Sequence, residues 1–282
     1  MKLDAATFLL QWATGGLFFG WVTTRRREVS LGYGWLIRIV FGIMAAAGAG
    51  IGVAAARRSL EEGARVLISD WHERRLGETL KQLRETHGDS VAALACDVTD
   101  ETQVQKLIVG AVREFGRLDV MINNAGLGGT ASVLDMTDDE WTRVLDVTLN
   151  GTFRCTRAAL KQLVAQGGGG AIVNNASVIG WRAQAGQAHY AAAKAGVMAL
   201  TRCAALDAAP HNIRVNAVSP SLAMHPHLAK VTSDELLAEL TGREAFGRAA
   251  EPWEVANVMV FLASDYASYL TGEVLSVSSQ QP

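Results

Sequence analysis

The sequence predicts an α/β fold in which helices cover both faces of a parallel sheet. Short, β-branched apolar runs alternate with longer segments of helical periodicity from about residue 36 onward. Several of the runs end in polar residues, as expected where parallel strands share one ligand-binding edge. With 282 residues, 49% of them apolar, the chain is long enough for one large core plus an appendage. We therefore predict a single doubly wound domain over residues 36–282, preceded by a hydrophobic helical extension over residues 1–35.

The extension contains an uncharged segment, residues 5–22, which is followed by Arg25-Arg26-Arg27. A membrane helix needs about 20 mostly apolar residues, and basic residues just after it favour the cytoplasmic side for the remainder of the chain. A membrane anchor that attaches a cytoplasmic protein to the cytoplasmic face is one interpretation. The other is a hydrophobic helix packed on the domain or on a partner subunit, and the sequence leaves both open. Asp4 argues against a cleaved signal peptide.

The first βα unit is predicted within an apolar stretch, residues 35–56, whose only charge is Arg38. This stretch could itself be scored as membrane-spanning. We favour a strand over residues 36–44, a glycine turn and a helix over residues 51–62, because the βα alternation continues downstream. Glycines let the backbone approach a pyrophosphate, and the helix start supplies amide donors. The residues predicted to bind a cofactor in this turn are Gly48, Gly50, Ile51 and Gly52.

Asp70 ends the next predicted strand, residues 65–69, and lies 18 residues beyond Gly52. An acid at this spacing can accept hydrogen bonds from both hydroxyls of an adenosine ribose and would repel a 2′-phosphate, which predicts NAD rather than NADP. A helix N-cap is the alternative role for Asp70. Asp97 follows the third strand and is predicted to reach the adenine. Its neighbour Val98 is also predicted to bind the cofactor.

The alternation continues to the C-terminus. The glycine tract at residues 167–170 precedes a strand, so it predicts a turn and not a phosphate loop. Residues 221–246 form a polar, helical excursion that is predicted to cover the site. The remaining elements are expected as helices over residues 73–86 and 101–115, a helical hairpin through Trp141, helices over residues 150–165 and 252–263, and strands over residues 91–95, 120–122, 171–173, 213–218 and 273–276.

Tyr190 and Lys194 are the strongest catalytic candidates. Spaced four apart on a helix, they lie one turn from each other on the same face. A cation beside a phenol stabilises the phenolate, which would bring the pKa of Tyr190 from about 10 toward neutrality. The pattern alone is common as a half-buried Tyr beside a surface Lys. Ser177, thirteen residues upstream at a strand end, makes convergence of three polar side chains at the carboxyl edge the preferred interpretation.

Composition argues against several other functions. A net charge of −2 and a pI near 6.3 do not favour a nucleic-acid partner. Three cysteines, Cys96, Cys155 and Cys203, have no metal-like spacing and suit a reducing cytoplasm. The six histidines are scattered, so no catalytic metal is predicted.

With these residues in view, residues 36–280 resemble the short-chain dehydrogenase/reductase family. The resemblance implies a Rossmann domain with a seven-stranded parallel sheet, a small-molecule alcohol or ketone substrate, and a homo-oligomer, either tetramer or dimer. It also implies that Tyr190 is the general acid/base, that Lys194 holds the nicotinamide ribose, and that Ser177 hydrogen-bonds the reacting oxygen. The matching motifs are the glycine turn, Asp70, Asp97, Asn123-Asn124-Ala125-Gly126, Ser177, Tyr190 with Lys194, Arg214-Val215-Asn216-Ala217-Val218-Ser219-Pro220 and Tyr269-Leu270-Thr271-Gly272; within them, Asn124, Ala125, Gly126 and Pro220 are expected to contact the cofactor.

The chain also departs from the family pattern. Thr148 occupies the position of the family's catalytic Asn, and Asn150, two residues on, would face elsewhere on a helix. The other departures are Ala45 and Ala46 in the glycine turn, Ser221 after Pro220, and His225 downstream. They support a second hypothesis, a catalytically impaired or membrane-tethered binding protein with the same fold. The intact Ser177, Tyr190 and Lys194 favour an active NAD-dependent alcohol dehydrogenase or ketoreductase.

The substrate is expected to lie between residues 181–187 and the excursion at residues 221–246. Trp181 would either line a partly apolar pocket, with Leu222, Met224 and Leu228, or simply pack, and Arg182, Gln184 and Gln187 are suited to polar or anionic groups. Residues 174–184 look like an actinobacterial subgroup linked to steroid-ring and acyl-CoA breakdown, which makes a substrate of that kind our expectation.

Overall fold

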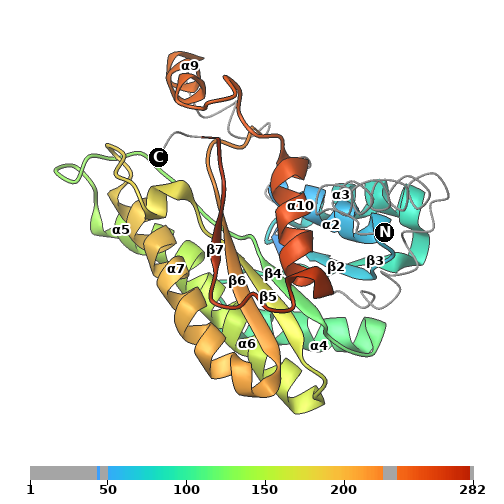
Figure 1. Ribbon diagram of the computed structural model, residues 1–282. Coiled ribbons are helices and arrows are strands. Elements are labelled where there is room, and N and C mark those ends of the chain that lie inside the picture. The colour runs from blue at the N-terminus through green and yellow to red at the C-terminus, as the bar shows by residue number, and fades with distance from the viewer. Residues whose placement is uncertain (1–42, 45–49, 225–233, 280–282) are drawn as a thin grey trace, which may run out of the picture.

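The computed structural model describes residues 43–44, 50–224 and 234–279, and every strand pairing among them is parallel (Figure 1). Hydrogen-bonded pairs define one sheet in the order β1-β2-β3 and another in the order β4-β5-β6-β7. The strands are β1 (Ile43–Met44), β2 (Val66–Ser69), β3 (Val91–Ala93), β4 (Val120–Asn123), β5 (Gly170–Asn175), β6 (Ile213–Pro220) and β7 (Val274–Val277).

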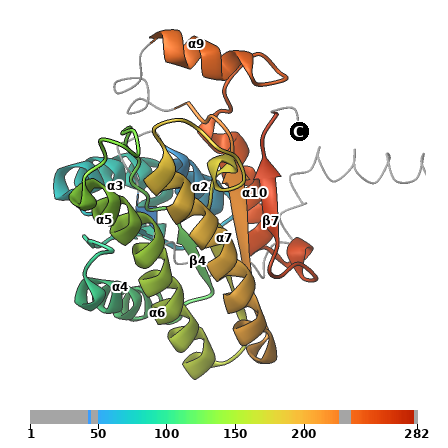
Figure 2. The same cartoon turned by 90° about the vertical axis from the view of Figure 1, so that its left-hand side faces the viewer.

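Helices cover both faces of the strands, which confirms the α/β fold class (Figures 1 and 2). Neighbouring strand residues enter opposite cores, because successive side chains of a strand point to opposite faces. Ile68 packs into the core under α2, α3 and α10, whereas Leu67 packs under α4, α6 and α7. The helices are α2 (Ile51–Glu61), α3 (Glu73–His87), α4 (Glu101–Phe115), α5 (Asp138–Leu145), α6 (Gly151–Gln166), α7 (Ala188–Ala208), α9 (Asp234–Gly242) and α10 (Pro252–Ala263).

Joining of the two groups into one seven-stranded sheet stays a prediction, since no hydrogen-bonded pairing of β1 with β4 occurs among the described residues. The expected extension, residues 1–35, lies outside them, as do residues 36–42 of the first strand and Ala45, Ala46 and Gly48 of the glycine turn. None of the described helices is long and apolar enough to cross a membrane.

Local capping explains why two helix predictions match the structure at both ends. The Asp100 side chain accepts hydrogen bonds from the amides of Thr102 and Gln103, so α4 begins where predicted. Pro252 occupies the first turn of α10, and Glu251 forms a capping box with Glu254. β6 extends to Pro220, beyond the predicted end at residue 218, because Pro220 lies beside Val277 of β7.

The helical hairpin expected through Trp141 is wrong. α5 runs without a chain reversal into a five-residue π-helical turn, η3 (Asp146–Asn150), and from there into α6. Asp146 and Gly151 both have right-handed helical backbone angles, so the segment is one helical rod with a local widening. Such π turns are frequent at functional sites.

The glycine tract before β5 is a turn, as predicted. Its glycines all have positive φ angles. A Cβ on Gly169 would lie 2.5 Å from the carbonyl oxygen of Asn212, which leaves room only for glycine where the chain approaches the start of β6.

Candidate functional site

Ser177, Tyr190 and Lys194 converge beyond the carboxyl end of β5. Ser177 caps the short 3₁₀ helix η4 (Val178–Gly180), its hydroxyl accepting a hydrogen bond from the amide of Ile179 at 3.3 Å. It also hydrogen-bonds the Tyr190 side chain. The Lys194 ammonium lies 5.6 Å from the centroid of the Tyr190 ring. The sequence therefore predicted the convergence of these three side chains.

Close packing of η4 on α7 brings the three side chains together. Gly180 lies where a Cβ would be 3.0 Å from the Lys194 carbonyl carbon and 3.0 Å from the Ala195 amide nitrogen. Any larger residue would push η4, and with it Ser177, away from the first turns of α7.

Burial sets the pKa directions of the two titratable groups. It raises the pKa of Tyr190, and the hydrogen bond from Ser177 offsets part of this rise. Burial lowers the pKa of Lys194 to about 8. The expectation that Lys194 brings the pKa of Tyr190 toward neutrality is therefore not met by the protein alone, because desolvation of the phenol outweighs the hydrogen bond from Ser177.

Lys194 sits in a small polar enclosure. Its ammonium donates a hydrogen bond to the carbonyl of Asn175 at 2.5 Å. The Asn175 side-chain amide donates in turn to Asn124 Oδ1 at 2.8 Å. On the other side, a Cβ on Gly126 would lie 3.4 Å from Lys194 Nζ. The loop after β4, which holds the predicted residues Asn124, Ala125 and Gly126, thus forms one wall of the Lys194 site.

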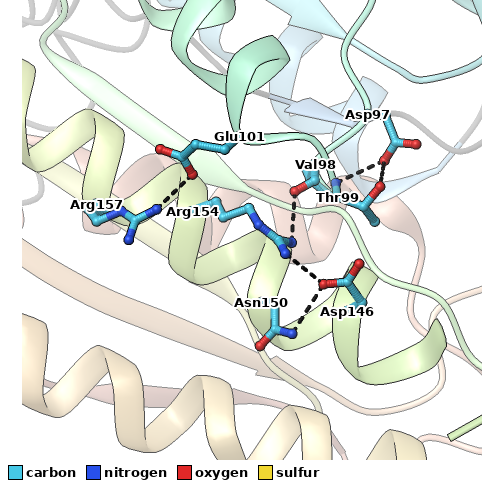
Figure 3. Close-up of polar contacts among 8 residues, drawn as sticks. All are labelled: Asp97, Val98, Thr99, Glu101, Asp146, Asn150, Arg154 and Arg157. Carbon is cyan, nitrogen blue, oxygen red and sulfur yellow. Dashed lines mark hydrogen bonds and ion pairs between the residues drawn. The ribbon is translucent and has the colours of Figure 1, made fainter. Parts of the chain in front are cut away.

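Thr148 lies behind this loop and is fully buried in η3. Its hydroxyl accepts a hydrogen bond from the Leu127 amide at 2.9 Å and donates one to the Leu127 carbonyl at 3.1 Å. Asn150 faces elsewhere, as predicted, and its amide donates to Asp146 (Figure 3). Asn150 therefore does not take the position vacated by the family's Asn.

The start of α4 is tied to the rod of α5, η3 and α6 (Figure 3). Arg154 donates to the Val98 carbonyl at 3.3 Å and to Asp146 at 2.8 Å. Asp97 Oδ1 accepts from both the amide and the hydroxyl of Thr99, at 2.9 and 2.8 Å. These bonds fix the loop after β3 that carries Asp97 and Val98, the two residues predicted there to bind the cofactor.

The start of α2 is suited to a phosphate group. Gly50 is the N-cap residue in extended conformation, and no side chain of the described residues caps the helix amides after it. Gly50 and Gly52 are buried and add no side chain at the helix start, where Ile51 is the first helical residue. Uncapped amide donors and the helix dipole favour an anion there.

Asp70 fits a sugar hydroxyl. It is 1% exposed, and its Oδ1 accepts from the amide of His72 at 2.8 Å and from Arg75 at 3.3 Å. Its Oδ2 is buried and finds no partner in the part of the chain that the structure describes. An unpaired buried carboxylate oxygen is costly, so this atom suits the hydroxyl of an incoming ribose. The N-cap alternative is wrong, because His72 is the N-cap residue of α3.

A cleft of about 600 Å³ lies next to η4, the 3₁₀ helix that Ser177 caps. One wall begins at Val178 and Ile179, directly after Ser177, and the other is the end of α9 and the segment after it, residues 240–245. Arg182 and Gln184 line it as expected, but Trp181 does not and is 46% exposed. Arg243 and Glu244 also line the cleft and were predicted only as part of the excursion, since no local pattern singles them out. His225 and Leu228 lie outside the described residues.

Glu244 anchors the outer wall of the cleft. Although charged, its side chain is buried, and it accepts hydrogen bonds from the Ser279 hydroxyl at 2.8 Å and the Leu222 amide at 3.4 Å. The backbone of the next residue, Ala245, donates to the Ser279 carbonyl. The segment after β7 therefore holds the end of the excursion in place.

Comparison with known proteins identifies the family. The pattern of a family described as enoyl-(acyl carrier protein) reductase matches residues 45–279. The crystal structure of a short chain dehydrogenase from Mycobacterium smegmatis superimposes with a TM-score of 0.78 at 57% identity, over 88% of this chain and 95% of that one. The chain belongs to the short-chain dehydrogenase/reductase family.

Two relatives within the short-chain dehydrogenase/reductase family are named for compounds that carry a hydroxyl on a ring. The chain is 61% identical, over 89% of its length and 96% of the relative's, to (5R,7aS)-5-hydroxy-7a-methyl-1-oxo-2,3,5,6,7,7a-hexahydro-1H-indene-carboxyl-CoA reductase of Mycobacterium tuberculosis. It is 42% identical, over 83% of its length and 93% of the relative's, to cis-4-hydroxycyclohexanecarboxylate dehydrogenase of Sinomonas cyclohexanicum. The chain is accordingly an oxidoreductase of the short-chain type, and its family implies a nicotinamide cofactor.

Proposed function

We propose that this short-chain dehydrogenase/reductase uses NAD to interconvert a secondary alcohol and a ketone, with Tyr190 as general acid/base. The observation that carries the proposal is the convergence of Ser177, Tyr190 and Lys194. A cleft of about 600 Å³, lined by Val178 and Ile179 directly after Ser177, offers space for a substrate. Residues 36–282 would form the catalytic domain.

Each of the three side chains has a separate task in this proposal. The bound nicotinamide supplies or accepts the hydride. Tyr190 gives its phenolic proton to the carbonyl oxygen during reduction and takes it back from the hydroxyl during oxidation. Ser177 holds the reacting oxygen with its hydroxyl, and loss of one such donor typically costs about 10²–10³ in rate. Lys194 binds the nicotinamide ribose and supplies positive charge beside the Tyr190 ring, so that the phenolate is better tolerated when it forms.

The proposed preference for NAD is supported by Asp70. Its unpaired Oδ2 suits a ribose hydroxyl and would repel a phosphate on the same sugar. The loop residues Asn124, Ala125 and Gly126, with Pro220 at the end of β6, would complete the cofactor site.

The substrate we propose is the CoA thioester of a fused-ring, steroid-derived carboxylic acid. The relative that is 61% identical is named for a bicyclic CoA thioester. Arg182 and Arg243 lie on opposite walls of the cleft. Among the described residues, Arg243 forms an ion pair with the exposed Glu239 at 2.5 Å, an interaction that contributes little and can yield to an anionic ligand. Glu244, the acid of the cleft, already accepts bonds from Ser279 and Leu222.

A homo-oligomer, dimer or tetramer, is also proposed. Large apolar side chains are exposed at Phe153 and Val164 on α6 and at Trp253 and Phe261 on α10. Burial of such groups against a second copy would remove them from water. Sedimentation analysis at micromolar concentration would return a single-chain mass if this is wrong.

The central test is Tyr190→Phe, which keeps the ring and removes the transferable proton. We expect NADH formation from a CoA-thioester or cyclic alcohol, followed at 340 nm, to fall by about 10³ or more. Tyr269→Phe is the matched control, because Tyr269 is fully exposed and should change nothing. Undiminished turnover in Tyr190→Phe would reject the mechanism. Calorimetric titration with NAD distinguishes this proposal from the second hypothesis, a binding protein without tight cofactor binding. The second hypothesis predicts that the titration gives no saturable heat.

A further inference from the structure

We infer that Thr148 is a positioning residue that holds the loop after β4 against Lys194, and that it does so through both hydrogen-bonding functions of its hydroxyl. The inference rests on the proposed function and concerns the same site. It assigns a role to one of the positions at which this chain departs from its family.

The hydroxyl of Thr148 is saturated by one backbone unit. It donates its only proton to the Leu127 carbonyl at 3.1 Å and accepts from the Leu127 amide at 2.9 Å. A hydroxyl has one proton to donate, so this group cannot also pass a proton to water without breaking its bond to Leu127. The hydrogen bonds of the Thr148 hydroxyl therefore hold the loop in position, and they do not fit a group that passes protons in a relay.

The loop that Thr148 holds is in contact with Lys194. Gly126, the residue before Leu127, is flanked by the two side chains: a Cβ there would lie 3.4 Å from Lys194 Nζ and 3.9 Å from the Thr148 methyl. A movement of Leu127 must therefore move Gly126, which would open or close the space around the ammonium.

The loop is fixed at its other end as well. Asn124 accepts a hydrogen bond from Asn175 at 2.8 Å, and the carbonyl of Asn175 accepts from Lys194 at 2.5 Å. The four-residue loop is thus held at two points. Asn124 is bonded to Asn175 of β5, and Leu127 is bonded to Thr148 of η3, with the ammonium between them. Thr148 is fully buried in η3, so water has no access to replace its hydroxyl.

Two substitutions at Thr148 separate positioning from mere packing. Thr148→Val keeps the shape and removes both hydrogen bonds, leaving the amide and carbonyl of Leu127 without their partner. We expect kcat to fall about tenfold with little change in KM for the alcohol, because the substrate cleft is untouched, and the Kd for NAD measured by calorimetry to rise several-fold. Thr148→Ser keeps both bonds and should retain at least about a third of the wild-type kcat. Thermal unfolding of both variants shows whether they are folded.

A double-mutant cycle with Lys194→Ala tests whether the effect passes through Lys194. If it does, Thr148→Val costs about tenfold in the wild-type background and less than about twofold in the Lys194→Ala background. Equal costs in both backgrounds would overturn the inference, as would wild-type kcat and NAD affinity in Thr148→Val. Measurement of the NAD affinity tests the inference independently of turnover. If the wild type is inactive but binds NAD more tightly than Thr148→Val does, the proposed reaction is rejected and the positioning role is retained.

Discussion

Burial of the Lys194 ammonium should make the stability of this protein rise between pH 7 and 10. A pKa lowered from 10.5 to about 8 corresponds to roughly 3 kcal/mol of folding free energy. The sign comes from proton binding. Between these two pKa values the unfolded chain holds a proton on Lys194 that the folded chain has released, so the free energy of unfolding increases with pH. The cost of the buried charge is complete below pH 8 and vanishes above pH 10.5.

The perturbation that isolates this effect is Lys194→Met, which removes the charge and keeps the length of the side chain. Relative to this variant, the wild type should gain about 1 kcal/mol between pH 7 and 9 and about 2–3 kcal/mol between pH 7 and 10. The assay is urea unfolding of both proteins at each pH, at one protein concentration so that any oligomerisation contributes equally.

Lys161, exposed on α6, provides the control, because Lys161→Met should differ from the wild type by a constant amount across the same range. A difference between the wild type and Lys194→Met that stays flat or shrinks from pH 7 to 9 would refute the reasoning. It would mean that the ammonium of Lys194 is solvated in the folded protein and that its burial does not shape the site.

Two further predictions address the cofactor and the cleft. Asp70→Ala should raise the ratio of kcat/KM with NADP to kcat/KM with NAD by tenfold or more. The variant removes a charge that repels the 2′-phosphate and frees Arg75 from its 3.3 Å pairing with Asp70. An unchanged ratio would contradict the role of Asp70 in selecting NAD. Glu244→Gln should raise KM for the alcohol several-fold and cost about 1–3 kcal/mol in urea unfolding, because the bonds to Ser279 and Leu222 are weakened. Glu239→Gln, at an exposed ion pair, should change the unfolding free energy by less than about 1 kcal/mol and so serves as its control.

The parts of the fold that depend on neighbouring residues were predictable. The ends of α4 and α10 were placed from capping residues that act within one turn of the helix. The hairpin expected through Trp141 was wrong, because no local signal in the sequence supports a chain reversal there. No glycine or proline interrupts residues 138–150, and the π turn that replaces the hairpin has no local signature in the sequence.

The sequence by itself determined which groups meet at the site, because a spacing of four on a helix places Tyr190 and Lys194 on one face and the end of a parallel strand places Ser177 at the same edge. Only the tertiary structure decided what state those groups are in. The pKa of Lys194 is lowered by distant residues that exclude water, and Thr148 bonds Leu127 across 21 positions of the chain. Desolvation and long-range hydrogen bonds depend on which segments pack together, and a local sequence pattern carries no record of that.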